Sequence, residues 1–273
     1  MSLQAKLEKI MDYNFLVDSH CHLDLLEQKG FDIDEVIENA RQNQVNFLQT
    51  IGTKISQFEQ VYRYAKKYPQ VFASIGIHPC NVEEEPKIKA EQIIQICQTH
   101  PKTIGIGETG LDYYHPGFVK ENQIESFLQH IKASRIVDKP LIIHTRNADL
   151  DMAKILEDEM KKGKFKAVLH CFSSSRELAQ KAIELGIFIS ISGIVTFKNA
   201  ADLQSIVCDL PLEFLIVETD SPYLAPTPHR SKVNQPAFTK NTAEFLANLK
   251  GVSFAEICQI TTSNFFRLFG DVV

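Results

Sequence analysis

Six short apolar runs of this chain each lead directly into a histidine or a carboxylate. The runs are rich in Ile and Val and bounded by Gly or Pro, which is typical of strands buried in a parallel sheet. The polar residue then stands at or just past the carboxyl end of its strand. The segments are 15–22, 74–79, 104–112, 141–146, 167–172 and 214–222. In a (β/α)8 barrel, this end of the strands carries the active site.

Segments of helical length separate these runs. Their apolar residues recur three and four positions apart, the spacing of an amphipathic helix. We expect helices at 33–43, 55–67, 90–99, 120–137, 150–162, 176–185, 200–208, 237–249 and 254–269, and two further strands at 45–51 and 187–191. Alternating strands and helices with right-handed crossovers predict an α/β fold, a (β/α)8 TIM barrel.

Length and charge narrow the class of protein. A chain of 273 residues with 44% hydrophobic content suits one barrel domain over 1–273, with 1–14 as an N-terminal extension. The net charge of −5 provides no general attraction for nucleic acid or an anionic membrane, so a phosphate-bearing substrate must be held locally. We expect a monomer.

Targeting signals and cysteine usage indicate a cytoplasmic protein. No apolar stretch approaches the roughly 18 residues of a membrane helix, and no secretory apolar region follows the N-terminus. The six cysteines are scattered and form no CxxC pair. Reduced thiols are therefore expected in place of disulfides.

His20 and His22 stand two apart on an extended segment, so they can bind one cation together. Such a pair alone is a weak signal and is more typical of satisfied polar residues at a strand end. Convergence favours the metal, because residues of the same kind follow four other strands and a barrel brings those ends together. These residues are Glu108, His144, His170 and Asp220.

Four histidines and two carboxylates exceed what one tetrahedral zinc uses, so we predict two divalent ions, Zn, Mg or Mn. Glu108 is expected to bridge them. The predicted ligands are His20, His22 and Asp220 for one ion, and His144 and His170 for the other. Two ions roughly 3.5–4 Å apart suit a phosphoryl transfer, in which Asp220 can also accept the proton of the attacking water.

Residues near these strand ends are candidate substrate contacts, each with a structural alternative. His78 can contact substrate or lie behind the ligands, or it can belong to a turn capped by Pro79. Arg146, two residues after His144, suits a phosphate oxygen, with a surface ion pair as the alternative.

Asp112 and Tyr113 are expected in a loop after Glu108. There Asp112 can orient a ligand and Tyr113 can stack on a base, and both can equally be loop packing. Glu218, two residues before Asp220, is expected to form an ion pair inside the barrel mouth.

A Pro-rich loop at 221–236 follows the last strand and is too long for a simple connection. It contains a compact basic cluster, His229, Arg230 and Lys232. A solvated loop is the ordinary interpretation of such a run. Its expected place over the barrel mouth makes phosphate contact a further interpretation.

Taken in order, these motifs resemble the signatures of the TatD-type metal-dependent deoxyribonucleases, most closely the YcfH-like branch. The resemblance covers residues 15–269 and rests on segments 18–24, 76–79, 107–114, 144–146, 169–172, 192–197 and 217–224. It implies a TIM-barrel hydrolase with a divalent metal pair that acts on DNA. The family's ligands match the six residues already named, with Glu108 in place of the carboxylated lysine that bridges metals in related amidohydrolases.

The chain departs from the family pattern outside the ligands. Many members have Gly and Glu where this chain has Ser231 and Gln235, and an Asp where it has Asn147. Substrate contacts of the loop are therefore expected to differ, whereas metal binding is not affected.

Three functions are compatible with the sequence. The first is a metal-dependent deoxyribonuclease, an exonuclease on single strands or ends. The second is an amidohydrolase or lactonase for a small metabolite, because the same barrel and metals can activate water against a carbonyl. The third, a non-enzymatic metal-binding scaffold, leaves a full ligand set idle. Glu108 at the bridge, Arg146 and the basic loop favour the phosphate substrate.

Overall fold

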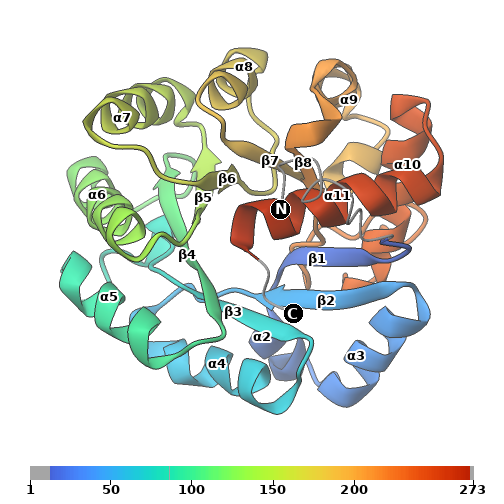
Figure 1. Cartoon of the computed structure of the whole chain (residues 1–273), viewed down its shortest axis with the longest axis horizontal. Coiled ribbons are helices and arrows are strands. Elements are labelled where there is room, and N and C mark those ends of the chain that lie inside the picture. Colours follow the sequence, from blue (N-terminus) through green and yellow to red (C-terminus); the bar gives the residue numbers. More distant parts are fainter. Residues whose placement is uncertain (1–12, 86, 271–273) are drawn as a thin grey trace, which may run out of the picture.

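The computed structural model describes residues 13–85 and 87–270, and it contains a single (β/α)8 barrel domain (Figure 1). Eight parallel strands are hydrogen-bonded in chain order. They are β1 (Leu16–Cys21), β2 (Val45–Thr50), β3 (Val71–Ile75), β4 (Thr103–Asp112), β5 (Leu141–Arg146), β6 (Ala167–Leu169), β7 (Phe188–Ile191) and β8 (Leu215–Val217). The predicted fold class is confirmed. Of the predicted N-terminal extension, residues 1–12 lie outside the described residues.

The barrel closes between its first and last strands. Ser19 Oγ donates to the backbone oxygen of Val217, and Cys21 forms a parallel bridge with Ser221. The backbone N–H of Asp220 donates to the His20 carbonyl at 2.8 Å, and that of His22 donates to the Ser221 carbonyl at 2.8 Å. Strands β1 and β8 therefore meet next to three of the predicted ligands, His20, His22 and Asp220.

Helices surround the barrel. They are α2 (Leu23–Gln28), α3 (Ile33–Gln42), α4 (Phe58–Lys67), α5 (Ala90–Thr99), α6 (Lys120–Val137), α7 (Asp149–Lys162), α8 (Arg176–Glu184), α9 (Ala201–Asp209), α10 (Thr239–Lys250) and α11 (Phe254–Phe269). Eight of them match the predicted helices within about two residues, and α4 begins three residues later than predicted. The short helix α2 was not predicted, and 3-10 turns at Ile55–Gln57 and Pro236–Phe238 begin two segments that were predicted as helix throughout.

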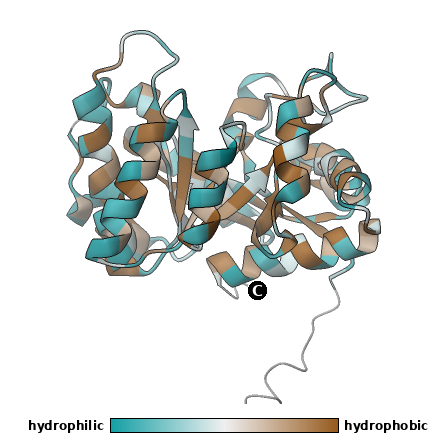
Figure 2. Ribbon diagram, turned by 90° about the horizontal axis from the view of Figure 1, so that it is seen from above, coloured by the Kyte–Doolittle hydropathy of each residue, from teal (hydrophilic) through white to brown (hydrophobic). Residues whose placement is uncertain are grey.

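An apolar floor closes the amino end of the barrel. Early residues of the strands, among them Phe72, Ile142 and Ile216, form a buried cluster with Phe265 and Phe269 of α11. Helix α11 runs across this end of the barrel, as Figures 1 and 2 show. Hydrophobic residues also mark the strands in Figure 2 and pack outward against the helices in a second cluster. In the described part of the chain, no helix has the length and apolar character needed to cross a membrane.

Candidate metal centre

All six predicted ligands come together at the carboxyl end of the barrel. The strands β1, β4 and β5 carry His20, Glu108 and His144, and the other three follow strand ends: His22, His170 and Asp220. Donor atoms of His20, His22 and Glu108 form one compact group, and those of His20, His170 and Asp220 form another. The structure thus places side chains from five strands around one point.

Strand β4 is longer than the sequence suggested, which corrects two positions. Glu108 lies within β4 and not at its end, and Asp112 is the last residue of the strand and not part of a loop. The reason is that β4 remains paired with β5 as far as Asp112 and Arg146. Glycine permits this close pairing, because at Gly110, with φ of +141°, a Cβ would lie 2.0 Å from the backbone oxygen of His144.

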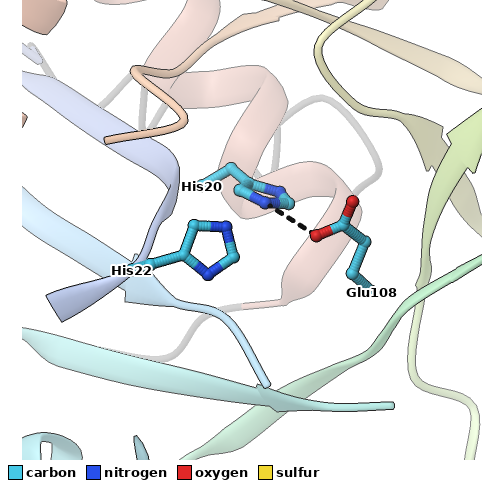
Figure 3. A group of neighbouring side chains, drawn as sticks. All are labelled: His20, His22 and Glu108. Atoms are coloured by element: carbon cyan, nitrogen blue, oxygen red, sulfur yellow. Dashed lines mark ion pairs between the residues drawn. The ribbon is translucent and has the colours of Figure 1, made fainter. Parts of the chain in front are cut away.

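The Glu108 carboxylate has imidazole nitrogens on both of its oxygens. Its Oε2 lies 3.4 Å from Nε2 of His20, as Figure 3 shows. Its Oε1 lies 2.7 Å from Nε2 of His170 and 2.9 Å from Nδ1 of His144. A carboxylate flanked in this way can place one oxygen on each of two cations.

Asp220 faces the β1 histidines from the opposite edge of the barrel seam. Its Oδ1 lies 3.4 Å from Nε2 of His22 and 3.6 Å from Nε2 of His20. The backbone of Asp220 has a φ of 57°, in the left-handed region that residues other than glycine rarely adopt. Such strained positions persist where the surrounding structure enforces them, and they cluster at functional sites.

The buried imidazole of His20 tests whether this set fits a metal. His20 is fully buried, and neither Nδ1 nor Nε2 has a hydrogen-bond partner among the described residues. A buried polar group without a partner is costly, so a coordinated cation would compensate Nε2. Together with the nitrogen and carboxylate donors around it, this makes the site chemically suited to divalent ions.

The cluster carries its own charge balance. Burial opposes the ionisation of Glu108, but the charges of His170 and His78 and hydrogen bonds from His144 hold its pKa well below the usual range. Burial also opposes a charge on His22, yet its hydrogen bond to Asp220 and the charge of that carboxylate raise its pKa to about 9. Both carboxylates are therefore anions, ready to ligate cations.

Outer carboxylates orient two of the histidines. Oδ2 of Asp112 lies 3.0 Å from Nε2 of His144, and Oε1 of Glu218 lies 3.4 Å from Nδ1 of His170. Each contact leaves the other ring nitrogen turned toward Glu108, which is how metal-binding histidines are usually supported. The ion pair expected of Glu218 is present. Asp112 contacts a candidate ligand, in agreement with its predicted orienting role.

The sequence interpretation assigned no role to Asp18, which is fully buried beside the site. Its carboxylate accepts hydrogen bonds from the backbone N–H of Thr219 at 2.9 Å and from the Thr219 hydroxyl at 2.6 Å. Asp18 thereby ties β1 to the segment that carries Asp220. Its spacing, two residues before His20 and four before His22, was the available signal.

His78 contacts the ligand cluster and also caps a turn. Its Nε2 lies 3.3 Å from Oε1 of Glu108, and its Nδ1 accepts the backbone N–H of Cys80 at 3.1 Å. Because Nδ1 is an acceptor, Nε2 carries the proton that faces Glu108. The cap comes from the His78 side chain itself, and not from Pro79, which was the structural alternative.

Arg146 is free to contact a substrate, whereas Tyr113 is occupied by packing contacts. The exposed Arg146 lies with its guanidinium carbon 3.8 Å from the centre of the Tyr114 ring, and it lines a surface pocket of about 870 Å³ with Ser173 and Ser174. The Tyr113 ring stacks on Phe118, and its hydroxyl donates to Asp151 at 2.9 Å. Tyr113 thus makes the packing contacts named as its alternative role.

The basic cluster of the long loop is also engaged in packing. The His229 ring stacks on Phe238 at 4.0 Å, and the Arg230 guanidinium lies 3.4 Å from the centre of the Phe197 ring. Lys232 is exposed. The contacts of His229 and Arg230 therefore resemble the ordinary loop interpretation, and phosphate binding by the cluster stays a prediction.

An eight-stranded parallel barrel with this cluster at its carboxyl end defines the class of metal-dependent barrel hydrolases. Residues 17–270 match the family model described as TatD related DNase. The chain belongs to this family. It is 44% identical over 263 residues to the metal-dependent hydrolase YcfH of Escherichia coli K12, covering 93% of this chain and 96% of that protein.

Other relatives agree with this membership. The metal-dependent hydrolase YabD of Bacillus subtilis is 36% identical over 254 residues, covering 93% of this chain and 98% of YabD. Among solved structures, the TatD homologue YjjV of Escherichia coli superposes with a TM-score of 0.87 at 28% identity, covering 95% of this chain and 99% of YjjV. The protein is a metal-dependent hydrolase of the TatD family.

Proposed function

We propose that this protein hydrolyses phosphodiester bonds of DNA, acting on single strands or ends with two divalent ions. The observation that carries the proposal is the Glu108 carboxylate, whose two oxygens face nitrogens of different histidines. His20, His22 and Asp220 would hold one ion, and His144 and His170 the other. When bound, such a pair lowers the pKa of water and stabilises the attacking and leaving oxygens of a phosphoryl transfer.

The chain's own residues divide the remaining work. Asp220 would accept the proton of the attacking water, because its carboxylate is anionic and faces His20, as Glu108 does. Burial opposes that charge, but the hydrogen bond from His22 and the charges of His20 and His22 lower the pKa of Asp220. Asp112 and Glu218 keep His144 and His170 turned toward Glu108.

Arg146 supports a phosphate substrate over a carbonyl compound. Its guanidinium is exposed and already lies over the Tyr114 ring, so little side-chain entropy is lost when it binds an anion. It lies two residues after His144 on the same strand and opens onto the pocket lined by Ser173 and Ser174. A phosphate next to the scissile bond can bind there.

The proposal is tested with metal-reconstituted protein and four substrate classes: a labelled single-stranded oligonucleotide, a closed duplex, a set of lactones and a set of amides. We expect progressive shortening of the single strand, and shortening slower by about 10²–10⁴-fold with Asp220→Asn prepared in parallel, which controls for contaminating nuclease. Turnover of a lactone or amide with an intact oligonucleotide would replace the proposal with the amidohydrolase or lactonase alternative.

A further inference from the structure

A second group of metal-binding side chains lies beside the candidate metal centre. Cys80 follows the His78 turn, Asp112 ends β4, and His115 stands in the next loop. Donor atoms of the three residues lie within 4.8 Å of one another. Sγ of Cys80 is 3.5 Å from Nδ1 of His115, which in turn is 2.8 Å from Oδ2 of Asp112. The mechanism proposed above uses neither Cys80 nor His115.

The group combines a fixed, buried carboxylate with two donors that reach solvent. Asp112 is fully buried, and its Oδ1 accepts the backbone N–H groups of Tyr114 at 2.9 Å and His115 at 3.0 Å. These bonds hold Oδ2 toward His115. The His115 side chain is 48% exposed and Cys80 is at the surface, so an ion can enter from solvent.

The distance between the sulfur and nitrogen donors suits a tetrahedral ion. Zinc–sulfur and zinc–nitrogen bonds of about 2.3 Å and 2.0–2.1 Å place the two donors about 3.6 Å apart, and Sγ of Cys80 lies 3.5 Å from Nδ1 of His115. One thiolate, one imidazole and one carboxylate form a donor set for zinc or cobalt and not for magnesium. We propose that Cys80, Asp112 and His115 bind a third divalent ion of this kind, with a solvent molecule as the fourth ligand.

This site adjoins the candidate metal centre through a shared carboxylate. Oδ2 of Asp112 faces Nδ1 of His115 at 2.8 Å and Nε2 of His144 at 3.0 Å. A carboxylate oxygen has two lone pairs, so it can accept the His144 N–H and still ligate an ion. An ion in the third site would therefore affect the contact between Asp112 and His144 that orients this histidine, whatever substrate the enzyme cleaves.

The test is a cobalt titration of the full-length protein, with bound metal counted by elemental analysis and thiolate ligation followed by its near-ultraviolet charge-transfer absorption. We expect three equivalents and a thiolate band in the wild type. Cys80→Ser should bind two equivalents and lack the band. Cys208→Ser is the matched control, because Cys208 is also exposed but lies on α9, away from this group.

Truncation of the second exposed ligand makes the assignment sharper. His115→Ala should weaken the third equivalent by more than the roughly 10–100-fold that loss of an outer contact costs, and it should leave the first two equivalents bound. Two equivalents with no thiolate band in the wild type would overturn the proposal. So would a third equivalent whose thiolate band persists in Cys80→Ser.

Discussion

Oε1 of Glu108 lies 2.7 Å from Nε2 of His170, and both side chains are buried. Nδ1 of the same imidazole faces Glu218, so His170 is held between two carboxylates. Its pKa rises well above the ordinary range, because the charges and hydrogen bonds of Glu108 and Glu218 outweigh the opposing effect of burial. A cation bound to Glu108 would replace the proton of His170 as the positive charge that balances these carboxylates.

Replacing Asp220 should affect turnover more than binding. The amide of Asp220→Asn can still contact His22, but it cannot take a proton from water. General base catalysis contributes about 10²–10⁴-fold, and we expect kcat to fall by that factor with a small change in KM. Steady-state kinetics on a single-stranded oligonucleotide, with metal content measured in the same sample, checks this. A change confined to KM would make Asp220 a positioning residue.

Binding of nucleic acid should depend only weakly on salt. The net charge is −5, and Arg146 is an exposed cation that lines the pocket, together with Lys120, which pairs with Asp151. Each phosphate neutralised on a single strand contributes about −0.7 to the slope of log K against log salt, so two or three contacts give about −1.4 to −2. Anisotropy of a labelled strand bound to Asp220→Asn measures this slope without cleavage.

Arg146→Ala in the same background should make that slope shallower by about 0.7, whereas Arg146→Lys should retain it. A steep slope together with efficient cutting inside closed duplex would contradict the expectation. Such a result would indicate a basic groove or an oligomer that supplies further cations.

The sequence predicted which side chains gather at the carboxyl end, because each follows an apolar run that a parallel barrel must bury. The structure brings His144 and His170 to Glu108 in this way, and their role as metal ligands stays a prediction. The end of β4 could not be predicted, because its pairing with β5 past Glu108 depends on the close approach at Gly110. Because of that pairing, Asp112 belongs to strand β4, whereas Tyr113 lies in the loop that follows.

Contacts between distant segments were also beyond the sequence. Asp18 meets Thr219 only because the barrel closes, and Arg230 packs on Phe197 only because two loops meet. No local spacing in the sequence predicts either contact. The supporting residues and the loop contacts therefore required the structure.

A buried histidine away from the metal centre should give the fold a dependence on pH. His130 of α6 accepts the backbone N–H of Ile77 at 3.1 Å, and its Nδ1 lies 2.7 Å from the Ser126 carbonyl. Burial lowers the pKa of His130 to about 4, against the hydrogen bond to Ser126. The unfolded chain then binds more protons between the two pKa values, so stability is present above the ordinary pKa and is lost as pH falls.

Between about pH 7 and pH 5 the loss from His130 alone is about 2 kcal/mol. Denaturant unfolding at both pH values measures it, with His130→Gln as the control because it removes the titration and keeps polar atoms at the site. We expect the pH dependence of the variant to be smaller by that amount. Equal dependence in both proteins would show that His130 does not titrate in this way.

The central claim is that Glu108 bridges two divalent ions, and metal analysis of two variants tests it most directly. His144→Ala should weaken one ion and retain the other, because His20, His22, Asp220 and the bridge remain. Glu108→Ala should lose both ions together, since its two oxygens face the histidines of both sites. Circular dichroism confirms that each variant is folded before metal is counted. Loss of both ions in Glu108→Ala is the predicted result, and full retention of one ion in that variant would contradict the account.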